Sequence, residues 1–202
     1  MPRLAKAVRA QIARAEKRDK KAGSVRAASV RAQSITTLWK GDELYDGLGV
    51  GSFEGRISLL WNGMDSFVYR PDFAKPFSYT TSKGKKIEPK LMETDGGSIP
   101  RVLRGLSKFS SWGYAPAFIL HDWLFVAHKC DCAPDNAYTF DESALLMAEA
   151  IKTLMKAGFK NYDGAVTKLE KAEDTLYLMY QGVASRIAKN LWNDLTTVRC
   201  MI

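Results

Sequence analysis

The side chains best suited to chemistry lie in two short segments of the chain. The first is Thr94-Asp95-Gly96-Gly97-Ser98-Ile99-Pro100, and the second, twenty residues after Pro100, is Leu120-His121-Asp122-Trp123-Leu124-Phe125. Carboxylate, hydroxyl and imidazole groups carry out most acid–base and nucleophilic catalysis in proteins. The candidate catalytic residues are therefore Asp95, Ser98, His121 and Asp122.

Asp122 must have a partner in the folded chain. His121 and Asp122 are the only ionisable residues between Tyr114 and Ala127, in a stretch too apolar for a surface helix. A buried carboxylate is costly unless it is paired or hydrogen-bonded. Adjacent helical residues point about 100° apart, so we expect His121 and Asp122 to reach different groups. The candidate partners of Asp122 are Arg101, Arg104, the backbone N–H groups of Gly96-Gly97, and the imidazole of His121.

Two interpretations of these residues remain open. In the structural one, Asp95 caps the turn before the next helix, and His121 and Asp122 bond that turn to a buried helix. In the functional one, they line a cleft as a Ser–His–Asp hydrolase, or hold zinc or manganese with Asp141 or Glu142. The chain has only two histidines, and neither a nucleophile elbow nor an oxyanion hole is evident. We therefore predict no metal and no cofactor.

The cysteines offer little chemistry. His128, Cys130 and Cys132 could supply three zinc ligands, but C-x-C lacks the two-residue spacer of a zinc knuckle. Three cysteines cannot form a disulfide framework, and Cys130 and Cys132 are poorly placed to bridge each other. We therefore expect reduced, inert thiols and a reducing compartment.

The two catalytic segments resemble the domain of unknown function number 1353 family, small proteins encoded by bacteriophages, prophages and bacteria. In that family a T-D-G-x-S-I-P segment follows a strand region and precedes an H-D-x-L-Y/F segment on a helix. The resemblance covers roughly Ser52 to Trp192, and this chain has Phe125 where the family more often has tyrosine. The resemblance implies a phage setting, with the protein in the virion or the host cytoplasm.

The first 33 residues form a basic arm. They carry ten basic and two acidic side chains, which equals the whole net charge of +8, so the remaining 169 residues are neutral. Leu4, Val8 and Ile12 form only a thin apolar stripe, which cannot build a core. The candidate nucleic-acid-binding residues are Arg3, Lys6, Arg9, Arg14, Lys17, Arg18, Lys20 and Lys21.

Two uses of the arm remain open. One is a solvated helix or a disordered tail that becomes ordered on a partner. The other is contact with nucleic-acid phosphates, since Lys and Arg without aromatic residues suit the backbone rather than the bases. A membrane-surface helix is disfavoured because Trp, Phe and a broad apolar face are missing. No apolar run is long enough to span a bilayer, so no membrane span is predicted.

The rest of the chain changes from a strand pattern to a helix pattern. Asn62-Gly63 and Lys83-Gly84 are hairpin turn signals between short β-like runs. The predicted strands are Ile57–Trp61, Ser66–Tyr69, Phe77–Thr81 and Ile87–Met92. The predicted helices are Arg101–Phe109, Tyr114–Lys129, Asp141–Lys156 and about Gly164–Trp192, of which the second is apolar on nearly all sides.

These patterns predict an α+β fold, in which a small antiparallel sheet precedes a helical bundle with a buried central helix. The arm at 1–33 is followed by a single domain at 34–202, sheet-rich over 47–93 and helical over 98–192. For function, we expect a phage-encoded, virion-associated structural or binding protein. Its arm would contact DNA, other virion proteins or another acidic surface. The alternative is a metal-assisted or Ser/His hydrolase at Asp95, Ser98, His121 and Asp122.

Overall fold

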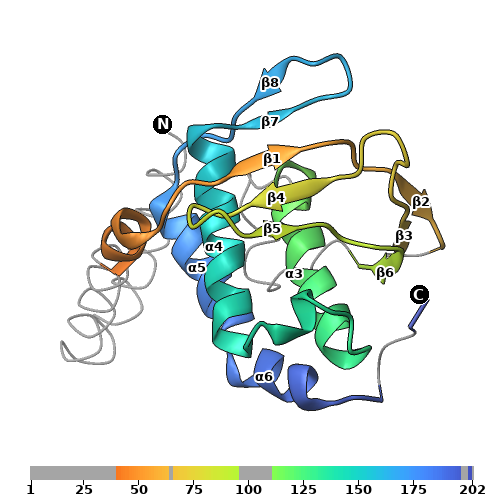
Figure 1. Cartoon of the computed structure of the whole chain (residues 1–202). Coiled ribbons are helices and arrows are strands. Elements are labelled where there is room, and N and C mark those ends of the chain that lie inside the picture. The colour runs from red at the N-terminus through yellow and green to blue at the C-terminus, as the bar shows by residue number, and fades with distance from the viewer. Residues whose placement is uncertain (1–39, 64–65, 96–110, 197–199, 202) are drawn as a thin grey trace, which may run out of the picture.

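A computed structural model describes residues 40–63, 66–95, 111–196 and 200–201 of the chain (Figure 1). Its elements form an α+β fold of short antiparallel strands followed by packed helices, which confirms the predicted fold class. The basic arm, Ser98 and the helix predicted at Arg101–Phe109 lie outside the described residues. None of the described helices is long and apolar enough to cross a bilayer.

The strands form two three-stranded sheets rather than one. The first has the order β1-β4-β5, with β1 at Ser52–Glu54, β4 at Ser78–Thr80 and β5 at Lys86–Ile87. The second has the order β2-β3-β6, with β2 at Leu59–Trp61, β3 at Phe67–Tyr69 and β6 at Met92–Thr94. Both predicted hairpin turns are present, and Gly63 and Gly84 have φ values of +97° and +80°.

The single strand predicted at Ile87–Met92 is wrong. Ile87 pairs with Tyr79 in the first sheet, whereas Met92 pairs with Tyr69 in the second. Pro89 lies between them and has no backbone N–H to donate to a strand ladder, so the chain leaves one sheet there and enters the other. The strand β1 was not predicted, because its flanking glycines obscure the pattern. Gly51 is needed there, since a Cβ atom would lie 2.3 Å from the carbonyl oxygen of Thr80.

The buried central helix is α3, at Ala115–Lys129, as predicted. A proline in its first turn suits the helix start, where the missing N–H has no helical partner. Its buried side chains occupy most of its circumference, including Phe118, Leu120, Trp123 and Leu124. This helix packs against β6 and against the next helix, and so links the sheets to the bundle.

The helix α4, at Phe140–Lys156, also agrees with the prediction. It begins with a capping box in which Thr139 and Glu142 bond each other's backbone N–H groups. It ends before Gly158, whose φ of +81° is a left-handed conformation that favours glycine. The hydroxyl of Tyr79 on β4 lies 2.9 Å from Oε1 of Glu149 and from Oγ1 of Thr153, so the first sheet is bonded to α4.

The long helix predicted at Gly164–Trp192 is wrong. A hairpin of β7 at Phe159–Lys160 and β8 at Val166–Thr167 comes first, with its turn held by Oδ1 of Asn161, which accepts from two backbone N–H groups. Two helices follow, α5 at Glu173–Val183 and α6 at Arg186–Asn193. The hydroxyl of Ser185 accepts from the N–H of Ala188 and so begins α6 as an N-cap.

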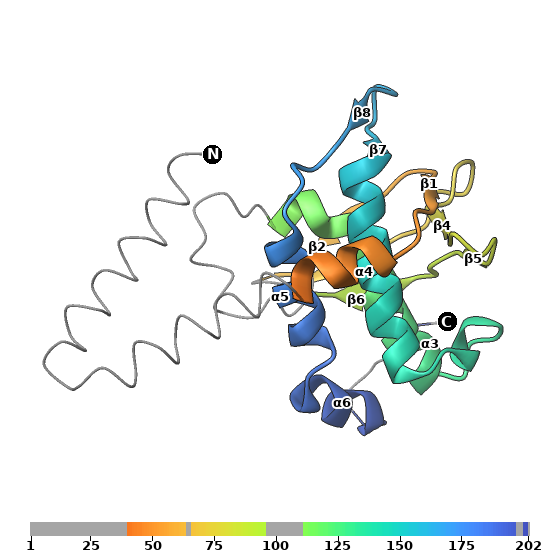
Figure 2. The same cartoon turned by 90° about the vertical axis from the view of Figure 1, so that its left-hand side faces the viewer.

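The helices lie close to one another in the bundle. Helix α4 packs between α3 and α5, and α6 contacts α3. The β7–β8 hairpin and α6 lie at opposite ends of the molecule in both views (Figures 1 and 2). Two 3₁₀ turns, Ser111–Tyr114 and Asp135–Ala137, flank α3. Helix α3 therefore contacts β6 as well as α4 and α6.

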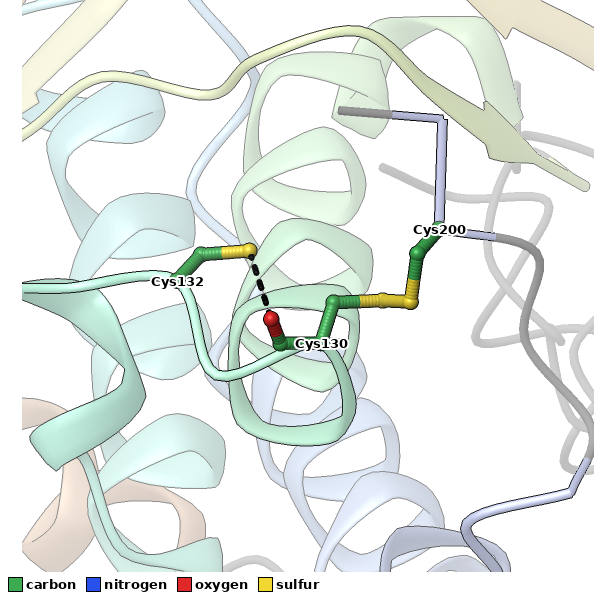
Figure 3. Close-up of a disulfide and its surroundings, with 3 residues drawn as sticks. All are labelled: Cys130, Cys132 and Cys200. Carbon is green, nitrogen blue, oxygen red and sulfur yellow. Dashed lines mark hydrogen bonds between the residues drawn. A yellow bond between two sulfur atoms is a disulfide. The ribbon is translucent and has the colours of Figure 1, made fainter.

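The expectation of three reduced thiols is wrong. Cys130 at the end of α3 and Cys200 form a disulfide, with 5.8 Å between their Cα atoms (Figure 3). Cys132 is free, and its thiol donates to the carbonyl oxygen of Cys130 at 3.5 Å. Cysteine pairing cannot be read from spacing alone, because the partner is brought back by the fold of the last seventy residues.

Breaking this disulfide should destabilise the protein. The bond closes a long loop, so removing it enlarges the unfolded ensemble, and Cys200→Ser should lower the free energy of unfolding by about 2–4 kcal/mol. Urea unfolding of the oxidised protein measures the loss. Cys132→Ser is the matched control because this thiol is unpaired. Equal stability of the Cys200→Ser variant and the wild type would contradict the expectation.

Candidate active site

The end of β6 and the middle of α3 bring the two candidate segments together. Strand β6 ends at Thr94, which pairs with Phe67 of β3, and Asp95 follows directly. His121 and Asp122 lie on α3, which packs against β6. Three of the four candidate catalytic residues, Asp95, His121 and Asp122, line one cavity. The fourth, Ser98, lies outside the described residues.

A partner of Asp122 is Thr94. The hydroxyl of Thr94 donates to Oδ2 of Asp122 at 2.5 Å. Thr94 is 4% exposed and Asp122 is half-buried, so this bond satisfies polar groups that lie largely away from water. Thr94 was not among the predicted partners, although it begins the first segment. The sign of this role in the sequence is that Thr94 directly precedes the candidate residue Asp95.

His121 is buried and electrically neutral. Its side chain is 7% exposed, and burial lowers the pKa of the imidazole from 6.5 to about 4, because the charged form is poorly solvated there. A hydrogen bond with the backbone of Ser143 on α4 raises the pKa of His121 and so opposes the effect of burial. The ring of Phe125, one turn further along α3, lies 4.9 Å from the imidazole.

One nitrogen of His121 has no partner. The Nδ1 atom is buried and has no hydrogen-bond partner in the described part of the chain. A neutral imidazole carries a proton on one ring nitrogen and a lone pair on the other, so Nδ1 is a hydrogen-bond acceptor in the tautomer that is protonated at Nε2. Buried polar atoms are almost always paired in folded proteins, so an unpaired acceptor at the wall of a cavity indicates a place for a ligand or a water molecule.

The cavity has a volume of about 430 Å³. Its described polar lining residues are Ser66, Glu93, Thr94, Asp95, His121, Asp122, Lys129 and Ser185. Its walls are mostly apolar, and come from α3, α4, α5 and α6. The described residues that form these walls are Phe118, Phe125, Val126, Met147, Met179, Gly182, Val183, Ser185, Ile187, Ala188 and Leu191. The sequence pattern did not predict the α5 and α6 walls, because it gave no sign of the break between these helices.

Lys129 also lines the cavity, two turns along α3 from His121. Partial burial lowers the pKa of its ammonium group, and the carboxylate of Asp194 opposes that shift. Among the described residues that line the cavity, the ionisable ones besides His121 are Glu93, Asp95, Asp122 and Lys129.

The other candidate ligands for a metal are used elsewhere. Glu142 belongs to the capping box of α4, and neither Asp141 nor Glu142 lines the cavity. His128 stacks on Trp192 with 4.2 Å between ring centroids, and Cys130 is in the disulfide. Within the described part of the chain, no three His, Cys, Asp or Glu side chains gather in a way that could hold a metal ion.

Asp122 should contribute more to stability than Asp95. Asp122 is half-buried against Thr94, whereas Asp95 is exposed. Replacing Asp122 by alanine leaves the buried Thr94 hydroxyl without this acceptor, so Asp122→Ala should cost about 1–3 kcal/mol. Asp95→Ala is the matched control, with an expected cost below about 0.5 kcal/mol. Chemical unfolding of both variants measures the difference, and equal small losses would show that the Thr94–Asp122 bond is not stabilising.

The fold and cavity define a class: an α+β protein in which a histidine and carboxylates from a strand end and a buried helix meet in an apolar cavity. Residues 72–160 match the model of a family described as protein of unknown function (DUF1353). The match is narrower than the resemblance seen in the sequence, but it includes Asp95, His121 and Asp122. No curated protein and no solved structure matches the chain.

Proposed function

We propose that the cavity is the active site of a hydrolase in which His121 activates a water molecule. The observation that supports this most is the buried Nδ1 atom of His121, which has no hydrogen-bond partner among the described residues and belongs to a side chain that lines the cavity. The low pKa keeps the imidazole unprotonated at neutral pH, which is the state that a general base requires. Attack by water uses only described residues and does not need Ser98 as a nucleophile.

The proton steps follow from this arrangement. A water molecule donates a hydrogen bond to Nδ1, its proton moves to that nitrogen, and its oxygen bonds to a carbonyl carbon of the substrate. The bond between that carbon and the leaving oxygen then breaks, and the imidazolium returns the proton to the leaving oxygen. Asp95 and Asp122 line the same cavity. Thr94 acts as a positioning residue, because it holds the Asp122 carboxylate.

Hydrolysis of p-nitrophenyl butyrate tests this proposal. His121→Gln removes the base but keeps a polar side chain of similar length, so kcat/KM should fall by about 10²–10⁴-fold. His128→Gln is the matched control, because His128 is the other histidine and does not line the cavity. The proposal fails if the wild type is no faster than buffer, or if His121→Gln hydrolyses the ester at the wild-type rate while remaining folded.

A second candidate function rests on the charge of the arm. We propose that residues 1–33 bind nucleic-acid phosphates, or an acidic surface of another protein, in a phage-encoded protein associated with the virion. The support is the concentration of the entire net charge of +8 in this segment, beside a neutral remainder. Such an arm would act independently of the cavity, so the two proposals can hold together.

A further inference from the structure

We propose that Trp192 is a positioning residue of this site, which holds the Phe125 ring against the imidazole of His121 and fastens α6 as a wall of the cavity. This inference rests on the proposed function, because it concerns the surroundings of the proposed base. Trp192 is not among the residues that line the cavity, whereas Phe125 and residues of α6 are. It therefore acts on the site through its neighbours and not by contact with a ligand.

Trp192 is the anchor of α6. The structure describes all eight residues of this helix, and Trp192, at 4% exposure, is the only buried one among them. Ile187 and Leu191 line the cavity, yet they are 75% and 45% exposed and so bury little surface against the rest of the protein. Ser185, the N-cap of α6, follows the end of α5 after one residue. Burial of one large aromatic side chain is therefore the main apolar contact that holds α6 in place.

Three rings from α3 and α4 contact Trp192. Its indole lies edge-on to Phe125 of α3, with 4.8 Å between the ring centroids and 87° between the planes. It stacks on His128, also of α3, with 4.2 Å between centroids, and it meets Phe140 at the start of α4 at 6.0 Å. Aromatic pairs in such arrangements are stabilised beyond the burial of their surfaces. These contacts fix α6 to α3 and to α4 at the same time.

The ring of Phe125 links Trp192 to the proposed base. Its centroid lies 4.9 Å from that of the His121 imidazole, which is one turn earlier on α3. Phe125 is half-buried and contacts both the imidazole and the indole. In a closely packed interior a side chain keeps its position because its neighbours fill the space around it. The indole of Trp192 thus keeps the Phe125 ring against His121.

Removal of the indole should let water reach His121. A smaller side chain at position 192 leaves a gap where α3, α4 and α6 meet, and surrounding groups fill such a gap only in part. Phe125 and α6 can then move away from the imidazole. Burial is the main cause of the low pKa of His121, and the hydrogen bond with Ser143 opposes it. Hydration of the imidazole therefore raises this pKa toward its ordinary value of 6.5.

Substitution of Trp192 leaves the ionisable side chains around His121 unchanged. Those that line the cavity are Glu93 and Asp95, on β6 and directly after it, and Asp122 and Lys129 on α3. The described lining residues of α4, α5 and α6 include no ionisable side chain. A shift in the pKa of His121 on substitution of Trp192 therefore reports a change in the burial of the imidazole.

NMR titration of the imidazole Cε1–H signals tests the inference without requiring turnover. The chain has two histidines, and His128→Gln assigns the two signals. In Trp192→Leu the titration midpoint of His121 should rise by about one pH unit or more, whereas Trp192→Phe, which keeps an aromatic ring, should restore most of the low midpoint. Trp61→Leu is the matched control, because Trp61 on β2 is 71% exposed. A purely structural role of Trp192 would lower stability and leave this midpoint unchanged, which would overturn the inference.

A second variant keeps the test decisive if Trp192→Leu does not fold. Phe125→Leu removes the ring between the indole and the imidazole but keeps an apolar side chain at a half-buried position, so it should fold. It should also raise the titration midpoint of His121. Circular dichroism shows whether each variant is folded. A wild-type midpoint in either folded variant would contradict the positioning role.

Ester hydrolysis separates this inference from the hydrolase. For p-nitrophenyl butyrate, the ratio of kcat/KM at about pH 5 to that at about pH 7.5 should fall from about nine-tenths in the wild type to about half in Trp192→Leu. A shifted NMR midpoint in a protein that hydrolyses no ester supports the positioning role and contradicts the hydrolase. Hydrolysis with equal midpoints in the wild type and in Trp192→Leu supports the hydrolase and contradicts the positioning role.

Discussion

Acid should destabilise the wild-type protein more than a variant that lacks the buried histidine. Between about pH 7.5 and about pH 4.5, the free energy of unfolding of the wild type should fall by about 2–3 kcal/mol more than that of His121→Gln. The cause is the difference between the pKa of His121 in the fold, about 4, and its ordinary value of 6.5. Urea unfolding at the two pH values, followed by tryptophan fluorescence, measures both losses.

The sign of this effect follows from proton binding. Between the two pKa values the unfolded chain protonates His121 and the folded chain does not, so the unfolded state binds the extra proton. The contribution of neutral His121 to the free energy of unfolding is therefore fully present above the pKa of the unfolded state, 6.5. It is lost as the pH falls toward the pKa of the folded state, about 4. His128→Gln keeps His121 and should lose stability like the wild type. Equal acid sensitivity of the wild type and His121→Gln would show that the imidazole is not buried and neutral.

Removal of the basic arm should abolish binding to duplex DNA. If about half of its ten basic side chains contact phosphates, the logarithm of the affinity should fall with the logarithm of the salt concentration at a slope of roughly −4 to −5. Little sequence preference is expected, because phosphate contacts carry no base information. Deletion of residues 1–33 leaves a neutral remainder and so removes this attraction.

Gel-shift titrations at several salt concentrations, with the full chain and with the deletion, measure this effect. The truncated protein should still fold, because the arm has almost no apolar side chains to contribute to a core. Circular dichroism of the truncated protein checks that point. Undiminished DNA binding after deletion would contradict the arm proposal. If neither protein binds DNA, the proposal that the arm binds nucleic acid is contradicted, and an acidic protein surface is favoured as its partner.

Helices and hairpins that are specified by residues close together in the sequence could be predicted. Helix α3 follows from an apolar stretch that begins with Pro116, and the β2–β3 hairpin follows from Asn62-Gly63 between two β-like runs. The region after Gly158 was wrongly predicted to be one long helix, because apolar residues at steps of three and four continue through it. The turn at Asn161 and the N-cap at Ser185 interrupt that pattern through side-chain bonds to the backbone.

The candidate site was predictable in its residues but not in its surroundings. The apolar context of His121 and Asp122 indicated burial, and both lie at one cavity with Asp95. The Thr94–Asp122 bond and the bond of His121 with Ser143 join segments far apart in the chain, so they depend on the packing of β6 and α4 against α3. The apolar walls from α5 and α6 exist only because the helices separate at Ala184-Ser185.

The pH dependence of ester hydrolysis tests the central claim, that neutral, buried His121 is the base. For p-nitrophenyl butyrate, kcat/KM is compared at about pH 7.5 and about pH 5, after correction for the buffer reaction. A base with a pKa of about 4 should keep about nine-tenths of its activity at the lower pH. An exposed histidine with an ordinary pKa would keep only about 3%. A fall of that size in the folded protein, or a profile that His121→Gln leaves unchanged, would contradict the account.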